Sequence, residues 1–156
     1  MALKKPSDNA VRAFARGMRD KSDALWSLGS KFLNQAQTTN IGRDFDFAAN
    51  RLYYSLYSIA AAHKTIHDGK IPPDVGPNVA VKDYVVTFFS NTHTLPRARY
   101  GSSYCTLKKL REKADYDEAS VNLKGFLKMK DWEAIRIELR NDVDRALGVP
   151  IITVSC

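Results

Sequence analysis

The residues best suited to chemistry lie in segment 48–58, where an arginine precedes tyrosines and serines. Arg51 stands three positions before Tyr54 and seven before Ser58, so on a helix the three side chains form one polar strip. A guanidinium next to a phenol ring can hold a phosphate by its planar fork while the ring stacks on a base. The alternative is that the tyrosines pack in the core and that Arg51 forms a salt bridge with a neighbour.

A second arginine lies on a mostly apolar helix face. Arg111 follows Tyr104 and Leu107 at helical spacing, so its charge needs a partner, and either Asp115 or Asp117 or an anionic ligand could supply one. From 97 to 113, six basic residues stand against the single acidic Glu112: Arg97, Arg99, Lys108, Lys109, Arg111 and Lys113. This bias suits contacts to phosphates, and it equally suits a solvated helix face.

Two histidines, His63 and His67, lie four positions apart and on a helix could share a metal ion. The glutamate of a zinc-protease motif is absent, and the remaining histidine, His93, lies in a separate loop. Because His63 continues an apolar stripe, we expect a packed histidine, and we predict neither a metal site nor a cofactor. The chain also has no glycine-rich phosphate loop and no nucleophile elbow.

Composition indicates a globular chain of one domain, 1–156, with a core over 7–147 and a short tail over 148–156. The formal net charge of +7 and the pI near 9.5 favour a polyanionic partner, although solubility alone would also explain them. The sequence has no apolar run long enough to span a bilayer, no signal peptide and no paired cysteines. We therefore expect a cytoplasmic protein that does not enter the membrane.

Apolar residues recur at helical spacing in three long segments: 11–32, with a polar gap near Lys21 and Ser22, then 48–63, and 132–147. Ser7 or Asp8 could cap the first helix. In the last, Asp131 could cap the start and Gly148 could end the helix before Pro150.

Two shorter segments complete the prediction. The segment 79–89 is rich in β-branched residues, but a lone strand would lack a partner, so we predict a helix. Another helix is predicted over 99–114, and no assignment is made for 117–130. The predicted fold is all-α, an up-and-down antiparallel bundle of four to five helices.

Two motifs, Asn50-Arg51-Leu52-Tyr53-Tyr54 and Arg111-Glu112-Lys113-Ala114-Asp115-Tyr116, resemble those of the HEPN superfamily. The chain is most similar in kind to small prokaryotic HEPN proteins encoded beside a minimal nucleotidyltransferase, over roughly residues 45–117. The resemblance implies a helical bundle that forms a homodimer, with both motif helices facing a shared cleft. It implies a ligand site made of Arg51, Tyr54, Arg111, Asp115 and Tyr116.

Many HEPN proteins are metal-independent ribonucleases in which a histidine follows an arginine after four to six residues. This chain departs from that pattern, because the window after Arg111 holds Asp115, Tyr116, Asp117 and Glu118 and no histidine. If the chain is an enzyme, the catalytic candidates are Arg111, Asp115 and Tyr116, together with His63 approaching from the facing helix.

Three functions follow. The first is a HEPN-like module that binds a nucleotide, an RNA or a partner nucleotidyltransferase, in a toxin–antitoxin or defence system. The second is a metal-independent ribonuclease toxin. The third is a structural or interaction bundle without a ligand, in which both arginines form internal salt bridges.

Overall fold

The computed structural model describes residues 7–39, 42–71, 77–90, 95–117 and 129–149, and within these ranges it contains five α-helices and no strand. The helices are α1 (Asp8–Thr39), α2 (Gly42–Asp68), α3 (Pro77–Ser90), α4 (Leu95–Tyr116) and α5 (Met129–Leu147). The predicted all-α bundle is therefore confirmed. The predictions for residues 118–128 and for most of the C-terminal tail lie outside the described residues.

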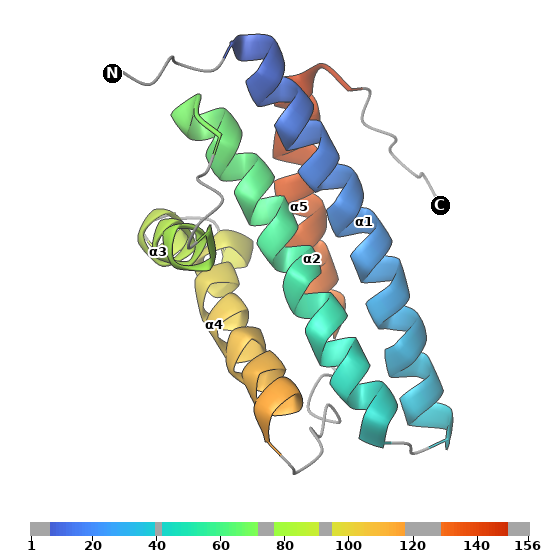
Figure 1. Cartoon of the computed structure of the whole chain (residues 1–156). Helices are drawn as coiled ribbons and strands as arrows, with labels where there is room; N and C mark the ends of the chain where they lie inside the picture. Colours follow the sequence, from blue (N-terminus) through green and yellow to red (C-terminus); the bar gives the residue numbers. More distant parts are fainter. Residues whose placement is uncertain (1–6, 40–41, 72–76, 91–94, 118–128, 150–156) are drawn as a thin grey trace.

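Four of the helices run up and down the bundle, and α3 runs across them (Figure 1). The central helix is α2, which contacts each of the other four helices. The end of α2 that carries Asp68 lies near the start of α1 and the end of α5, and the other end lies near the end of α4 (Figure 1). The surroundings of a side chain on α2 therefore depend on its position along the helix and on which of the other helices it faces.

Two of the predicted helix caps are present. The Ser7 hydroxyl accepts a hydrogen bond from the Ala10 amide at 3.2 Å, which caps the start of α1. At the other end of the chain, Gly148 adopts a φ of 70° and ends α5. The Val149 amide then donates to the Asp144 carbonyl at 2.8 Å, which satisfies one of the last carbonyls of the helix.

The prediction for the start of α5 is wrong, and the prediction of a helix over 79–89 is confirmed. The prediction that α5 starts after Asp131 is wrong, because α5 (Met129–Leu147) already includes residue 131. Segment 79–89 is helical, as predicted, despite its β-branched residues. Val81 and Val85 of this helix are fully buried, so packing against neighbouring helices overrides the local preference for a strand.

Small side chains bring α1 and α2 very close together. At the polar gap of the sequence, the Ser22 hydroxyl donates to the Ser55 carbonyl and the Ser55 hydroxyl donates to the Ser22 carbonyl, both at 2.8 Å. Both serines are fully buried. About two turns further along α1, Gly29 faces Leu52 without any side chain between the backbones. The gap is therefore a contact between helices and not a break in α1.

Tyrosines fill the contact between α2 and α4. Tyr53, Tyr100 and Tyr104 are among the largest fully buried side chains of the described residues. Tyr100 donates its hydroxyl hydrogen to the Leu56 carbonyl at 2.6 Å, and the hydroxyls of Tyr53 and Tyr104 lie 3.2 Å apart. Because buried hydroxyls need partners, these bonds fix the rotation of α4 about its axis relative to α2.

Ion pairs join α1 to α5. Arg19 lies against the buried carboxylate of Asp144, with Nε 2.9 Å from Oδ1. Asp23 accepts contacts from Arg136 Nη1 at 2.6 Å and from Arg140 Nε at 2.9 Å. These three arginines therefore join α1 to α5, and each lies against a carboxylate of the neighbouring helix.

The close approach at Gly29 predicts a position-specific loss of stability. A Cβ atom there would lie 2.9 Å from Leu52 Cγ and 3.1 Å from the Leu52 amide nitrogen, whereas a Cβ at Gly17 would meet nothing within 4 Å. We expect Gly29→Val to lower the free energy of unfolding by about 2–3 kcal/mol, and Gly17→Val to leave it unchanged or slightly higher. Urea denaturation measures both, and equal values for the two variants would contradict the close approach.

Candidate functional site

Arg111 lies on α4 above a group of aromatic rings. Its guanidinium carbon is 5.3 Å from the ring centre of Tyr54, 5.7 Å from that of Tyr53 and 6.0 Å from that of Tyr116. Its side chain is only 16% exposed. The predicted placement of Arg111 on the face of Tyr104 is therefore confirmed, and the cation is held by ring faces from both motif segments.

Asp115 balances the charge of Arg111, as one of the predicted alternatives requires. Arg111 Nε lies 2.9 Å from Asp115 Oδ2, but its N–H does not point along that line, so the contact is an ion pair and not a hydrogen bond. The amide of Asn50 donates to both Asp115 oxygens, at 3.2 and 3.3 Å. Asp115 thus ties α4 to α2 as well as facing Arg111.

Arg51 differs from Arg111 because it has no carboxylate partner among the described residues. Its Nε atom is buried and has no hydrogen-bond acceptor, while the residue as a whole is half-buried. The Nε atoms of Arg111, Arg136 and Arg140 also lack a hydrogen-bond acceptor among the described residues, so the missing carboxylate is what distinguishes Arg51 from them. The predicted alternative of a salt bridge to a neighbouring residue is not what the structure has.

Tyr54 lies one turn after Arg51 on α2 and under the guanidinium of Arg111. Side chains on a helix lean toward its N-terminus, so the Tyr54 ring leans toward the turn that carries Arg51. The guanidinium of Arg111 faces the same ring at 5.3 Å. Of the predicted ligand residues, Tyr54, Asp115 and Tyr116 all contact Arg111, whereas Arg51 is linked to them only by its place one turn before Tyr54 on α2.

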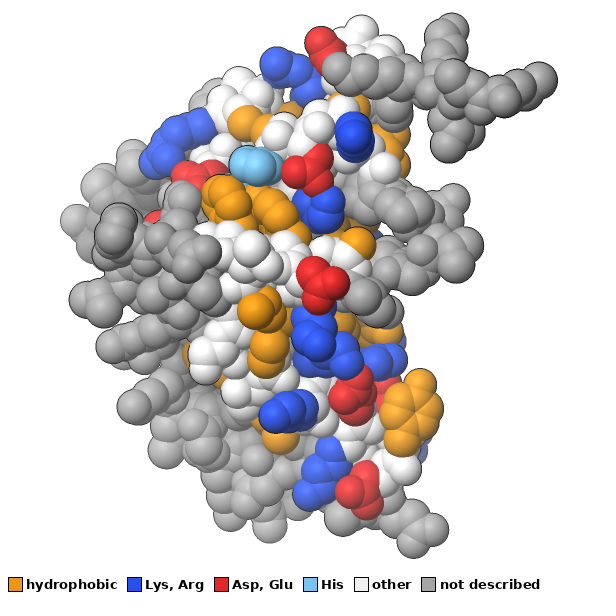
Figure 2. All heavy atoms as spheres, turned by 90° about the vertical axis from the view of Figure 1, so that its left-hand side faces the viewer, with side chains coloured by type: hydrophobic (Ala, Val, Ile, Leu, Met, Phe, Trp, Pro, Cys, Tyr) orange, Lys and Arg blue, Asp and Glu red, His pale blue; other side chains and the backbone are white. Residues whose placement is uncertain are grey.

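Ser58, the third member of the predicted polar strip, is fully buried, and its hydroxyl has no hydrogen-bond partner. The strip therefore ends in the core and does not continue along the surface. The basic bias of α4 is also weaker in space than in sequence, because Lys108 pairs with Glu112 and Arg111 with Asp115. On the face shown in Figure 2, basic and acidic side chains lie next to one another.

The structure does not bring His63 to Arg111. His63 is nine to ten residues beyond Tyr53 and Tyr54 on α2, a rise of about 15 Å. Its Nδ1 atom lies 2.8 Å from the Tyr84 hydroxyl of α3, and its Nε2 atom lies 3.6 Å from Asp142 Oδ2 of α5. His63 therefore joins three helices near the far end of α2, as the prediction of a packed histidine requires.

Two cavities flank the other histidine at this end of the bundle. A cavity of about 720 Å³ lies between α2 and α3, with His67, Tyr84 and Phe88 in its wall. A second cavity, of about 460 Å³, lies between α2 and α5 and is lined by both His63 and His67. The Tyr84 and Phe88 rings are stacked, with centres 5.1 Å apart. Sequence spacing gave no indication of this arrangement, because its walls come from three helices.

Sequence reasoning also missed two groups next to the arginines. Asn50 lies inside the first motif, but its bond to Asp115 depends on how α4 packs on α2. Arg43 and Phe47 precede Arg51 at intervals of four residues, and Arg43 lies 5.2 Å from the Phe47 ring centre. The second group could have been found from sequence, since the spacing alone places these residues on one helix face.

Comparison with known proteins yields no relative, because no family model, no curated protein and no solved structure matches the chain. The HEPN resemblance therefore depends on the two motifs alone. None of the described helices combines the length and the apolar character needed to cross a membrane. Within the same residues, no group of three or more histidine, cysteine, aspartate or glutamate side chains is arranged to hold a metal ion.

Burial raises the pKa of four tyrosines on α2 and α4. Desolvation raises the pKa of Tyr53, Tyr57, Tyr100 and Tyr104 above the usual value of 10.0, and the shift is large for Tyr100 and Tyr104. A tyrosine whose pKa is raised in the folded state does not change the free energy of unfolding at pH values below its unfolded-state pKa. Stability falls as the pH rises above about 10, because the unfolded chain then releases protons that the folded chain retains.

We therefore expect the free energy of unfolding to be level below about pH 10 and to fall above it, by about 1.4 kcal/mol per pH unit for each buried tyrosine. The double variant Tyr53→Phe/Tyr104→Phe removes two such groups together with the bond between them, so it should be nearly neutral at pH 7 and fall less steeply above pH 10. Denaturation at a series of pH values measures this. A wild-type curve as shallow as that of the double variant would contradict it.

Proposed function

We propose that this protein is a HEPN-like binding module whose ligand carries phosphate groups, as a nucleotide or an RNA does. The proposed site consists of Arg51, Tyr54, Arg111, Asp115 and Tyr116. In this site Arg51 would bind a phosphate, and the exposed ring of Tyr116 would stack on a base. The net charge of +7 would attract such a ligand over a longer range.

The main support for this proposal is that Arg51 lacks a carboxylate partner among the described residues. Arg19, Arg136 and Arg140 all lie against carboxylates of neighbouring helices. Arg51 has no such partner in the described part of the chain, and its buried Nε lacks an acceptor. A phosphate would supply the anionic partner that Arg51 lacks and that Arg19, Arg136 and Arg140 have in aspartate carboxylates.

Binding is favoured over catalysis at this site. General acid–base cleavage needs a group that can exchange a proton near neutral pH, and the histidine closest to the motif along α2 is held at Tyr84 and Asp142. The carboxylate of Asp115 is engaged by Arg111 and Asn50. A ribonuclease that uses Arg111 with Asp115 or Tyr116 remains an alternative, but no contact specifically supports it.

A purely structural bundle is the other alternative. The pairing of Arg111 with Asp115 suits it, but Arg51 does not, since among the described residues it lacks the carboxylate partner that Arg19, Arg136 and Arg140 have. The HEPN resemblance alone suggests a homodimer, a nucleotidyltransferase partner and a toxin–antitoxin or defence role, whereas the cytoplasmic location is proposed from the sequence composition. These remain proposals, and the molar mass in solution tests the first of them.

Arg51→Gln should weaken binding without unfolding the protein. Loss of a charge-assisted bond to phosphate should lower the affinity for a fluorescent oligouridylate or for ATP about tenfold or more. The thermal midpoint should stay level or rise, because the variant removes an unsatisfied charged group. Fluorescence anisotropy, calorimetry and thermal melts measure these effects.

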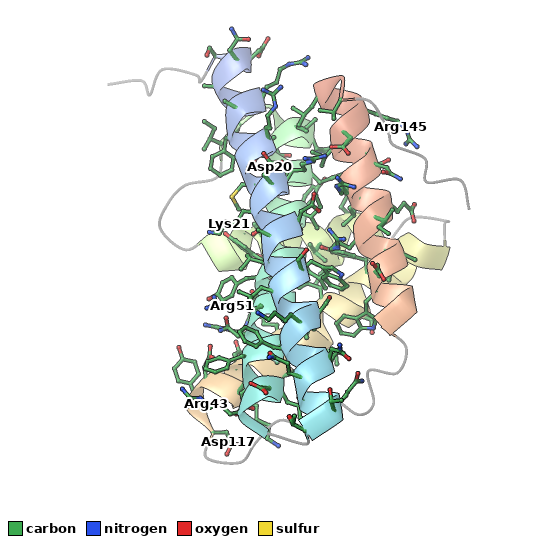
Figure 3. The ribbon with its side chains drawn as sticks, turned by 90° about the vertical axis from the view of Figure 1, so that its right-hand side faces the viewer. Asp20, Lys21, Arg43, Arg51, Asp117 and Arg145 are labelled. Atoms are coloured by element: carbon green, nitrogen blue, oxygen red, sulfur yellow. The ribbon has the colours of Figure 1, made fainter. Side chains whose placement is uncertain are left out.

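Arg145→Gln is the matched control, since it also removes one positive charge. Arg145 lies on α5, is 66% exposed and projects from the edge opposite to Arg51 (Figure 3). It should change affinity by less than about twofold. Equal effects of the two variants would reduce the site to general charge attraction, and a large drop in melting temperature for Arg51→Gln alone would indicate a structural role.

Asp115→Asn should strengthen binding. The substitution keeps the shape of the side chain but removes the charge that balances Arg111, so Arg111 becomes available to a phosphate. We expect an affinity gain of about threefold or more, with a stability loss of about 1–3 kcal/mol because the mostly buried Arg111 loses its charged partner.

Asp20→Asn adds the same charge on α1, where Asp20 pairs with Arg19. This control should change affinity much less than Asp115→Asn. If the two variants bind alike, Arg111 has no part in the site.

A further inference from the structure

The surface that carries Arg51 extends along α2 beyond the two motifs. Arg43, Phe47, Arg51 and Tyr54 are spaced by four, four and three residues, so they lie on one face of the helix. Basic and aromatic side chains alternate along this face, and neighbours that are four residues apart are separated by a rise of about 6 Å. We call these four residues the α2 stripe.

The exposed rings near the stripe are each accompanied by an arginine. The described residues include five large hydrophobic side chains that are exposed, and two of them are aromatic: Phe47, at 39%, and Tyr116, at 81%. The guanidinium carbon of Arg43 lies 5.2 Å from the Phe47 ring centre, and that of Arg111 lies 6.0 Å from the Tyr116 ring centre. Phe32 of α1 supports Phe47, with ring centres 5.4 Å apart.

Neither Arg43 nor Arg51 has a carboxylate within ion-pair distance among the residues that the structure describes. Both project from the edge of the molecule that also carries Lys21 and Asp117 (Figure 3). In contrast, the arginines between α1 and α5 are all paired. The surface thus combines open rings with available guanidinium groups over several turns of one helix.

We propose that the α2 stripe, together with Arg111 and Tyr116, binds a single-stranded nucleic acid several nucleotides long. This inference rests on the proposed function and narrows its ligand from any phosphate compound to an unpaired polynucleotide. Bases stack on Phe47 and Tyr116, and the phosphates between them lie against Arg43 and Arg51. A duplex cannot use the rings, because its bases are already stacked and paired.

Fluorescence anisotropy with labelled oligouridylate and oligothymidylate of about twelve nucleotides tests the proposal, since such sites span about 4–16 nucleotides. The single strands should bind at least tenfold more tightly than a duplex of equal length or a dinucleotide. Phe47→Ala and Tyr116→Ala should each weaken binding about fivefold or more, as the loss of one stacked base requires. A preference for one sugar identifies RNA or DNA as the ligand.

The salt dependence of the affinity reports phosphate contacts, because base stacking alone would not change it. In Arg43→Gln and Arg51→Gln, the slope of log affinity against log salt should fall by about 0.7, the value expected for one lost phosphate contact on a single strand. Arg145→Gln and Ile137→Ala on α5 are the matched controls for lost charge and lost apolar surface, since Ile137 is also 39% exposed. Both should leave slope and affinity unchanged.

The outcomes separate this inference from the proposed function. If a mononucleotide binds as tightly as the oligomers and Arg51→Gln still weakens it, the stripe is refuted while the phosphate site stands. If the duplex binds as well as the single strand, or if Phe47→Ala and Tyr116→Ala have no effect, the stripe is also refuted. If no nucleotide and no oligonucleotide binds, both proposals fail.

Discussion

The close contact between α1 and α2 is the constraint on which the rest of the structure depends. Reciprocal hydrogen bonds between Ser22 and Ser55, together with the bare backbone of Gly29 against Leu52, fix both the distance and the register of the two longest helices. Once this pair is set, α2 has one face against α1 and the remaining faces for α3, α4 and α5. The rotation of α2 about its axis then determines where its polar side chains point, since each residue of a helix projects in one direction.

The buried tyrosines fix the orientation of α4 relative to α2. Their hydroxyls find acceptors only when α4 lies at one rotation, and that rotation directs Arg111 over the rings of Tyr53 and Tyr54. The same residues therefore serve packing and the candidate site. This explains why one tyrosine-rich segment could be interpreted either as core or as a surface for a ligand: Tyr53 is core, and Tyr54 lies at the boundary between core and surface.

The fold followed from sequence periodicity, because helices in a bundle bury one face and the spacing of apolar residues records that face. The five helices and the burial of Tyr100, Tyr104 and Leu107 were predictable for this reason. The partners of charged groups were predictable only within one helix. Arg111 and Asp115 are four residues apart on α4, so spacing offered Asp115 as a partner but could not choose between Asp115, Asp117 and a ligand. That Asn50 of α2 bonds to Asp115, and that His63 faces Tyr84 and Asp142, depends on contacts between helices far apart in sequence. Spacing along one helix carries no information about them, and it supplied only candidates.

The contact between the two outer helices has a practical consequence for handling this protein. Near the start of α1, Arg12 donates to the Ala146 carbonyl near the end of α5, so the described chain enters and leaves the bundle at the same end (Figure 1). The 32 residues of α1 span about 48 Å, and Arg43 lies at the far end of that length. A tether attached before α1 or after α5 would thus start at the pole remote from Arg43, which leaves that surface free when the molecule is immobilised.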